Sequence, residues 1–393
     1  MTVQQRHAVI LGGGVAGLAL SVALRARAGW RVTLLEQAPA LTEVGAGLQI
    51  SPNGAVVLGA LGLAPALEAV SMRADAVVLR DGGQGAKVLR MALPAGGAGF
   101  HLVHRADLVE ILAAAAHAQG VDVRLDEQAV MVDPHGPLPK AVLHDGRVVE
   151  GDLLAAADGL HSVMRETILG AARPAFTGQV AWRALIPGDP DAPPEAQVFM
   201  GPGRHLVSYP LRGGSLRNIV AVEERAAWAD EGWNIRDDAA HVRAAFAGFG
   251  GPVPGWLAQV EGPWLWGLFR HAVATNWFMG HGVLLGDAAH PTLPFMAQGA
   301  NMALEDAWVL TAMLLRHAEI PRALAAYQTA RHARATRIVA AANANARNYH
   351  LRGPLRPLAH LALRIGGRIA PQAPLRRFGW LWDHDVTRAH PVN

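Results

Sequence analysis

Apolar and polar positions follow the order strand, turn, helix, strand at the beginning of the chain. The runs His7–Leu11 and Arg31–Leu35 are short and apolar, and Val15–Ala28 between them is rich in Ala and Leu. This spacing predicts one helix between two strands. Strands that alternate with helices at this length are typical of a parallel sheet.

The pattern changes twice further along the chain. The stretches "GVDVRLDEQAVMV" and "GRVVEGDLLAAADG" predict additional strands. From about Val180 to Arg270, short alternating runs such as "HLVSYPL" indicate an antiparallel sheet that forms a second layer. From Ala300 onward the pattern is helical. We therefore expect an α/β protein with a Rossmann-like domain, an interleaved and mostly antiparallel β-sheet domain, and a C-terminal helical segment.

Composition narrows the class of protein. The chain has 393 residues, of which 51% are hydrophobic and 17% charged, so it can bury a large core. No apolar run reaches the roughly 18–20 residues that span a bilayer, and we expect no signal peptide because the N-terminal run leads directly into a short strand. We expect a cytoplasmic protein without stable membrane insertion. The absence of cysteine excludes disulfides, thiolate metal sites and redox-active cysteine pairs.

The charge balance gives little information about partners. The formal net charge is only +3, with Arg favoured over Lys, and no basic run indicates nucleic-acid binding. We expect no nucleic-acid partner and no metal, and either a monomer or a homodimer.

Three glycines separate the first predicted strand from the first predicted helix. Gly12, Gly14 and Gly17 form the pattern Gly-x-Gly-x-x-Gly, which permits the turn, lets a pyrophosphate approach the backbone and lets helix and strand pack closely. The helix N-terminus offers free N–H groups to the phosphates. Glu36 ends the second strand, where a carboxylate binds the adenosine ribose of FAD or NAD and disfavours a 2′-phosphate.

Further motifs extend this pattern along the chain. They read "GGGVAGLA", "LLEQ", "GAGLQISPN", "HRADL", "AADGLHSVMR" and "GDAAHPTLPFMAQGANMALEDA", in this order. In this order they resemble the single-component FAD-dependent aromatic hydroxylases (flavoprotein monooxygenases), over nearly the whole chain. The branch most similar contains salicylate hydroxylase, 3-hydroxybenzoate 6-hydroxylase and 6-hydroxynicotinate 3-monooxygenase.

The resemblance implies a non-covalent FAD and a set of residues around it. It implies that Asp287 binds the ribityl chain, and that the backbone of Gly299, Ala300 and Asn301 lies near the pyrimidine edge of the flavin. A helix N-terminus there stabilises the negative charge of the reduced ring. Arg105 would lie near the flavin phosphates, unless it forms a surface ion pair with Asp107. Asp158 belongs to a motif associated with FAD and nicotinamide contacts, with Ser162 as a helix cap.

The resemblance also implies the chemistry. NADH or NADPH reduces the flavin, O2 adds to form a C4a-hydroperoxyflavin, and its terminal oxygen attacks an electron-rich ring. The protein must then exclude water and help a phenol, whose pKa is about 10, to lose its proton.

The stretch "GRHLVSYPLRGG" supplies candidates for this step. In a strand, His205, Val207 and Tyr209 share one face, so His205 and Tyr209 can form a proton relay. The resemblance implies that His205 is the base and that Tyr209 orients the substrate; a half-exposed His and a core Tyr are the structural alternative. Pro294 is expected to face the substrate, whereas 3-hydroxybenzoate 6-hydroxylase carries Gln there, which disfavours that substrate.

Two other features are interpreted as structural. His290 follows the Gly-Asp motif directly and is expected to pack or to bind the loop. Trp182 and Arg183 are expected to be a core Trp and an Arg that extends toward solvent.

These expectations divide the chain into three parts. The FAD-binding domain covers residues 1–72, 100–178 and 272–345, the substrate-binding domain covers 73–99 and 179–271, and the C-terminal helical segment covers 346–393. The expected function is hydroxylation of a small phenolic or N-heteroaromatic acid in aromatic compound catabolism. A hydroxylase of a polyprenyl phenol or polyketide, a non-hydroxylating flavin reductase or oxidase, and a flavin-binding sensor remain as alternatives.

Overall fold

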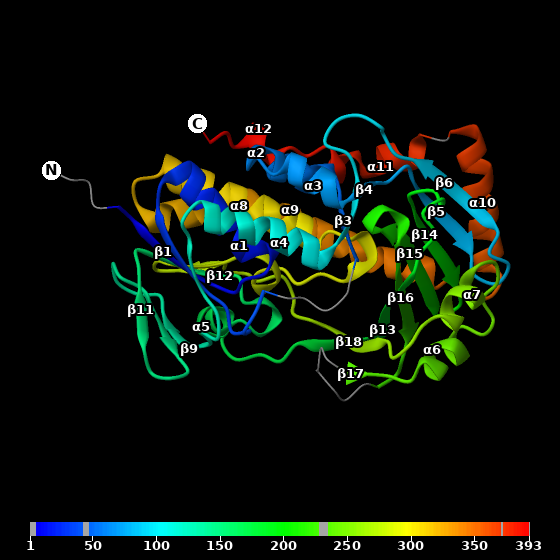
Figure 1. The fold of residues 1–393 in the computed structure, drawn as a ribbon, viewed down its shortest axis with the longest axis horizontal. Coiled ribbons are helices and arrows are strands. Elements are labelled where there is room, and N and C mark those ends of the chain that lie inside the picture. The colour runs from blue at the N-terminus through cyan, green and yellow to red at the C-terminus, as the bar shows by residue number, and fades with distance from the viewer. Residues whose placement is uncertain (1–4, 42–46, 228–234, 371, 393) are drawn as a thin grey trace.

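The computed structural model describes residues 5–41, 47–227, 235–370 and 372–392. The first two residues of the predicted motif "GAGLQISPN" lie outside these ranges. The molecule is elongated, with one sheet and its helices at one end and a large second sheet at the other (Figure 1).

A six-stranded sheet carries the N-terminal part of the fold. Its order is β19-β20-β12-β1-β2-β8, and every pair is parallel except β19 with β20. The strands are β1 (His7–Leu11), β2 (Arg31–Leu35), β8 (Asp122–Arg124), β12 (Leu153–Ala156), β19 (Phe278–Met279) and β20 (Gly282–Leu284). β1 and β12 are buried along their whole length, as expected for parallel strands covered on both faces.

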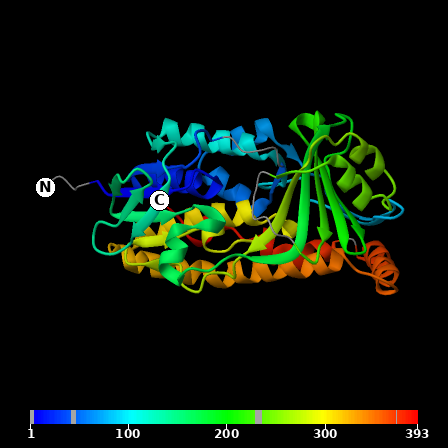
Figure 2. The same ribbon diagram turned by 90° about the horizontal axis from the view of Figure 1, so that it is seen from below.

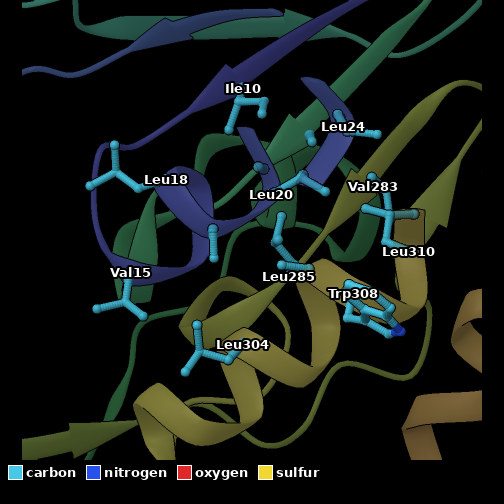
Figure 3. Close-up of a cluster of buried hydrophobic side chains, with 14 of the residues drawn as sticks. Ile10, Val15, Leu18, Leu20, Leu24, Val283, Leu285, Leu304, Trp308 and Leu310 are labelled. Carbon is cyan, nitrogen blue, oxygen red and sulfur yellow. The ribbon is translucent and has the colours of Figure 1, made fainter. Parts of the chain in front are cut away.

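The helices that cover this sheet come from distant parts of the sequence. They include α1 (Val15–Ala23), which continues as a π-helical turn to Ala28, α4 (Arg105–Ala118), α5 (Val163–Leu169) and α8 (Gly299–Arg316). Apolar side chains of β1 and α1, such as Ile10 and Leu18, gather with Leu285 and with Leu304 of α8 in one core (Figure 3). The predicted Rossmann-like architecture is confirmed.

An eight-stranded sheet forms the second layer. Its order is β17-β18-β13-β16-β15-β14-β5-β6, and only β5 with β14 is parallel. The strands are β5 (Ala76–Asp81), β6 (Lys87–Ala92), β13 (Ala175–Pro187), β14 (Glu195–Gly201), β15 (Arg204–Leu211), β16 (Leu216–Glu224), β17 (Ile235–Arg236) and β18 (Trp264–Arg270). Helices α6 (Ala239–Ala245) and α7 (Val253–Ala258) pack on one face through the cluster that contains Trp182, Phe199 and Phe246.

Small sheets and short helices complete the chain. The strands are β3 (Gly47–Ile50), β4 (Met72–Arg73) and β7 (His101–His104) in one sheet, and β9 (Ala129–Asp133), β10 (Lys140–Leu143) and β11 (Val148–Glu150) in another. The remaining helices are α2 (Pro52–Ala60), α3 (Ala64–Val70), α10 (Leu355–Ile369), α11 (Ala373–Trp382) and α12 (Val386–Ala389).

The long helix α9 (Ile320–Tyr349) runs along the molecule from the parallel sheet to the eight-stranded sheet (Figure 2). It continues without a break through the predicted boundary at residue 345, and α10–α12 follow it. The division into three domains remains a prediction. Across the described ranges, no helix is both long enough and apolar enough to cross a membrane.

Candidate active site

A cleft lies between the parallel sheet and the eight-stranded sheet. It consists of two adjoining cavities of about 500 Å3 and 270 Å3. They share the lining residues Gly14, Arg105, Ala157, Gly159, Asp287 and Thr292. The larger cavity lies over the glycine turn, and the smaller one lies against β15 and β16.

The glycine turn has the geometry of a phosphate-binding loop. Gly12 has φ +97°, and a Cβ there would lie 2.5 Å from the Ala157 carbonyl oxygen. A Cβ on Gly17 would overlap the carbonyl oxygen of Gly12, so helix and strand can approach only without it. At Gly14, the N-cap of α1, a Cβ would meet no atom within 4 Å. That open space lies in the cleft at the positive end of a helix, where a pyrophosphate fits.

Glu36 and Asp158 are among the acids that line the same cavity. Glu36 accepts hydrogen bonds from the amides of Gly13 (2.6 Å) and Ala38 (2.8 Å), which fixes its carboxylate at the end of β2. Asp158 accepts from the Val163 amide at 3.1 Å, and burial raises its pKa to about 6. Ser162 caps α5 by accepting from the Arg165 amide at 3.1 Å, as predicted.

Asp287 and Arg105 lie where the two cavities meet. Burial raises the pKa of Asp287, although His290 and Arg105 oppose the shift. Protein atoms surround the carboxylate, but the side chain is exposed where it borders both cavities, so it is accessible from the cleft. Asp107 forms its ion pair with Arg212 at 2.5 Å, so the predicted alternative partner of Arg105 is engaged elsewhere.

The N-terminus of α8 closes one side of the smaller cavity. Gly299 and Ala300 line it, together with Pro294. The side chain of Asn301 is fully buried instead: it accepts from the Ser51 amide (2.9 Å) and donates to the carbonyls of Gln49 (3.0 Å) and Ala297 (2.7 Å). Asn301 thus ties the chain after β3 to α8, while the first amides of the helix remain directed toward its N-terminal end.

A buried ionic network lies behind the cleft. Asp306 accepts from the amide of Gly286 (2.9 Å) and pairs with His290 Nε2 (2.5 Å) and Arg331 Nε (2.8 Å). Glu305 pairs with Arg331 and with Arg334 and accepts from Asn53. His290 therefore belongs to this network and not to the lining of the cleft, which agrees with its exclusion from the catalytic candidates.

The face of β15 predicted to carry chemistry does line the smaller cavity. His205, Val207 and Tyr209 all border it, with Val220 and Val222 of the paired strand β16. Burial, together with the charge of His350, places the pKa of His205 well below its ordinary value. Burial also raises the pKa of Tyr209 above its ordinary range, so its hydroxyl stays protonated.

Arg183 was missed at the sequence level. Trp182 is a core residue, as predicted, and donates to Asp237 at 2.6 Å, but Arg183 lines the cavity and its guanidinium lies 4.0 Å from the centre of the Trp266 ring. Burial and the nearby charge of Arg105 lower its pKa to about 10. The interpretation of Arg183 as a solvent-directed side chain is wrong. Alternation along β13 indicates only that Arg183 points to the face opposite the core Trp182, and it does not tell whether that face borders a cleft or solvent.

These residues fit FAD. The Gly14 space, Glu36, the carboxylate of Asp287 and the α8 N-terminus lie along one continuous cleft in the order that a dinucleotide with a flavin ring requires. The roles of the individual residues remain predictions.

Comparisons with known proteins agree with this geometry. Residues 5–342 match the family described as "FAD binding domain". The chain is 36% identical over 318 residues to 3-amino-4-hydroxybenzoate 2-monooxygenase of Streptomyces platensis, covering 78% of each chain. It is 32% identical to 3-hydroxybenzoate 6-hydroxylase 1 of Aquipseudomonas alcaligenes, covering 97% of this chain and 98% of the relative. Among solved structures, the R204Q variant of Klebsiella pneumoniae HpxO complexed with FAD has a TM-score of 0.81 at 26% identity, covering 93% of this chain and 96% of that one.

The family match spans most of the chain, and the relatives cover nearly the same length. The predicted family resemblance and the FAD cofactor are thereby confirmed. The chain belongs to the FAD-dependent aromatic hydroxylases, a family of flavoprotein monooxygenases.

Proposed function

We propose that the protein hydroxylates a small phenolic or N-heteroaromatic acid, using O2 and either NADH or NADPH. The observation that carries this proposal is the smaller cavity, which Arg183, His205 and Tyr209 line together with Val207, Val220 and Val222. Its volume of about 270 Å3 lies just below the roughly 300–1,000 Å3 that is typical of ligand pockets. Because the flavin ring takes part of this space beside Gly299 and Ala300, we infer that the remainder favours a single-ring substrate over a polyprenyl chain.

Three polar groups of the cavity have a task in this proposal. Arg183 binds the substrate carboxylate. Its guanidinium is buried near the positive charge of Arg105, so a bound anion lowers the electrostatic free energy of the site. Tyr209 keeps its proton and orients the ring through its hydroxyl. His205 is neutral at neutral pH and takes the phenolic proton, which makes the ring nucleophilic.

The bound FAD supplies the oxygen activation. The chain's part is to position the substrate, to exclude water with the apolar lining of Val207, Val220 and Val222, and to hold a partial positive charge at the α8 N-terminus beside Gly299 and Ala300. We infer that NAD(P)H binds transiently, that the reaction occurs in the cytoplasm, and that the protein acts as a monomer or homodimer.

The test is aromatic-stimulated NAD(P)H oxidation by the FAD-loaded protein, with 3-hydroxybenzoate, salicylate and 6-hydroxynicotinate compared with the corresponding carboxamides. We expect at least one acid to accelerate oxidation and its amide to do so much more weakly. Equal effects of acids and amides would contradict the role of the carboxylate. No effect of any aromatic compound would contradict the hydroxylase.

A further inference from the structure

His205 is linked to the outside of the molecule by a second histidine. His205 Nδ1 lies 2.7 Å from Nε2 of His350, the residue that follows α9, and His350 Nδ1 lies 2.9 Å from Oε1 of Glu224 at the end of β16. Both imidazoles are buried, with 1% and 4% of their surface exposed. The Glu224 side chain is 37% exposed and, with Arg352, lines a hollow on the surface.

The partners fix the direction of the hydrogen bonds. A carboxylate only accepts, so His350 donates from Nδ1 to Glu224 and carries its lone pair on Nε2. His205 must then donate from Nδ1 to that lone pair. Its own lone pair is on Nε2, the ring atom left for a ligand in the cavity that His205 lines. The chain of bonds thus presents a base to the cavity.

Burial and the neighbouring charges keep both imidazoles neutral and Glu224 ionised. Burial lowers the pKa of His350, Arg352 and Arg204 lower it further, and Glu224 acts in the opposite direction. Burial raises the pKa of Glu224, but the hydrogen bonds from His350 and Arg352 outweigh burial and leave it lowered. Tyr349 also packs against His205, and burial raises its pKa to about 12, so it does not titrate with them.

We propose that His350 and Glu224 form a proton relay that carries the phenolic proton from His205 to the surface hollow. The proposal rests on the function proposed above. The substrate O–H bond breaks as His205 Nε2–H forms; the Nδ1 proton of His205 moves to Nε2 of His350; and the Nδ1 proton of His350 moves to Glu224, which releases it to water. Reverse transfer to the product phenolate restores both tautomers, so no proton is gained or lost over the cycle.

The test uses a chromophoric phenolic acid, 4-hydroxy-3-nitrobenzoate, whose absorbance changes on ionisation. It is mixed with the oxidised FAD-loaded protein at a pH where the free probe is mainly protonated, and ionisation is followed by stopped flow. Glu224→Gln keeps an oxygen to accept the His350 bond but cannot take a proton, and it lies at the surface, so folding is retained. His350→Gln interrupts the relay in its middle. His360→Gln is the matched control, because buried His360 pairs with Asp81 at 3.1 Å outside the cavity lining.

We expect Glu224→Gln and His350→Gln to slow ionisation of the bound probe by about 100-fold, in the range of lost acid–base catalysis, with unchanged probe affinity. His360→Gln should behave as the wild type. Equal ionisation rates in all four proteins would overturn the relay and leave the proposed function intact. Failure of the wild type to bind or ionise the probe would overturn both, and loss of affinity in Glu224→Gln without slower ionisation would show a structural role instead.

Discussion

The Asp306 carboxylate on α8 accepts a 2.9 Å hydrogen bond from the amide of Gly286, the residue that precedes Asp287. A side chain of the helix therefore fixes the turn that aims Asp287 into the cleft. The same carboxylate is held by His290 and Arg331. The network that stabilises the fold is thus also the support of the cofactor site.

Asp306→Asn tests this coupling. Loss of the charge leaves Arg331 partly uncompensated in a buried position, so we expect the free energy of unfolding to fall by about 3 kcal/mol and FAD affinity to fall with it. Denaturant unfolding and FAD titration measure both. Glu68→Gln, which breaks an exposed pair with Arg73, should change stability by less than about 1 kcal/mol. Equal effects of the two substitutions would contradict the supporting role.

Two substitutions in the glycine turn distinguish an effect on folding from an effect on cofactor binding. Gly14→Ala adds a methyl group in open space, so we expect the apoprotein stability to change by less than about 1 kcal/mol while FAD binding weakens by about tenfold or more. Gly17→Ala forces a methyl group onto the Gly12 carbonyl and should cost more than about 2 kcal/mol in stability. If Gly14→Ala binds FAD as the wild type does, the phosphate site lies elsewhere.

Arg183→Met should change stability and substrate binding in opposite directions. Removal of a cation that burial and Arg105 disfavour raises the unfolding free energy of the apoprotein. Loss of the carboxylate contact raises KM for the acid substrate by about 100-fold, with no change for its carboxamide. Steady-state kinetics with the acid and the amide check this. Arg90→Met, which removes an Arg from an ion pair with Glu195 that is not part of the cavity lining, should leave both KM values unchanged.

The pH profile tests His205. Its lowered pKa keeps the imidazole neutral below pH 6.5. The kcat/KM of the wild type should therefore stay constant as the pH falls through the range in which an ordinary histidine titrates, and it should decline only at lower pH. Without this base, the His205→Asn variant can react only with substrate that is already ionised in solution. We expect its kcat/KM to fall by about 100-fold or more near neutrality and to rise with pH toward the phenol pKa of about 10. A flat profile in the variant would remove His205 from the mechanism.

The strand-turn-helix unit was predictable because its signals are local. Gly12, Gly14 and Gly17 fall at the turn, and the predicted strands His7–Leu11 and Arg31–Leu35 have the bounds of β1 and β2. Alternation likewise placed His205 and Tyr209 on one face of β15, the face that lines the cavity.

The rest depended on contacts between distant residues. His350 and Glu224 are separated by 126 positions, and no local sequence pattern predicts their 2.9 Å hydrogen bond. The hydrogen bond from the Gly286 amide to Asp306 likewise cannot be predicted from the hydrophobic periodicity of the sequence. Arg183 was misjudged for a different reason: a charged residue beside a core Trp is usually solvated, and only the position of β13 against the cleft reverses that expectation.

Hydroxylation under 18O2 tests directly whether the protein inserts oxygen into an aromatic acid. The FAD-loaded protein is supplied with NADH or NADPH and with the acid that most accelerates its oxidation, and the product is analysed by mass spectrometry. We expect a product with one added hydroxyl that carries one 18O atom, and little peroxide. Oxidation of NAD(P)H that yields only peroxide, with no labelled product from any aromatic acid, would contradict the proposed hydroxylation.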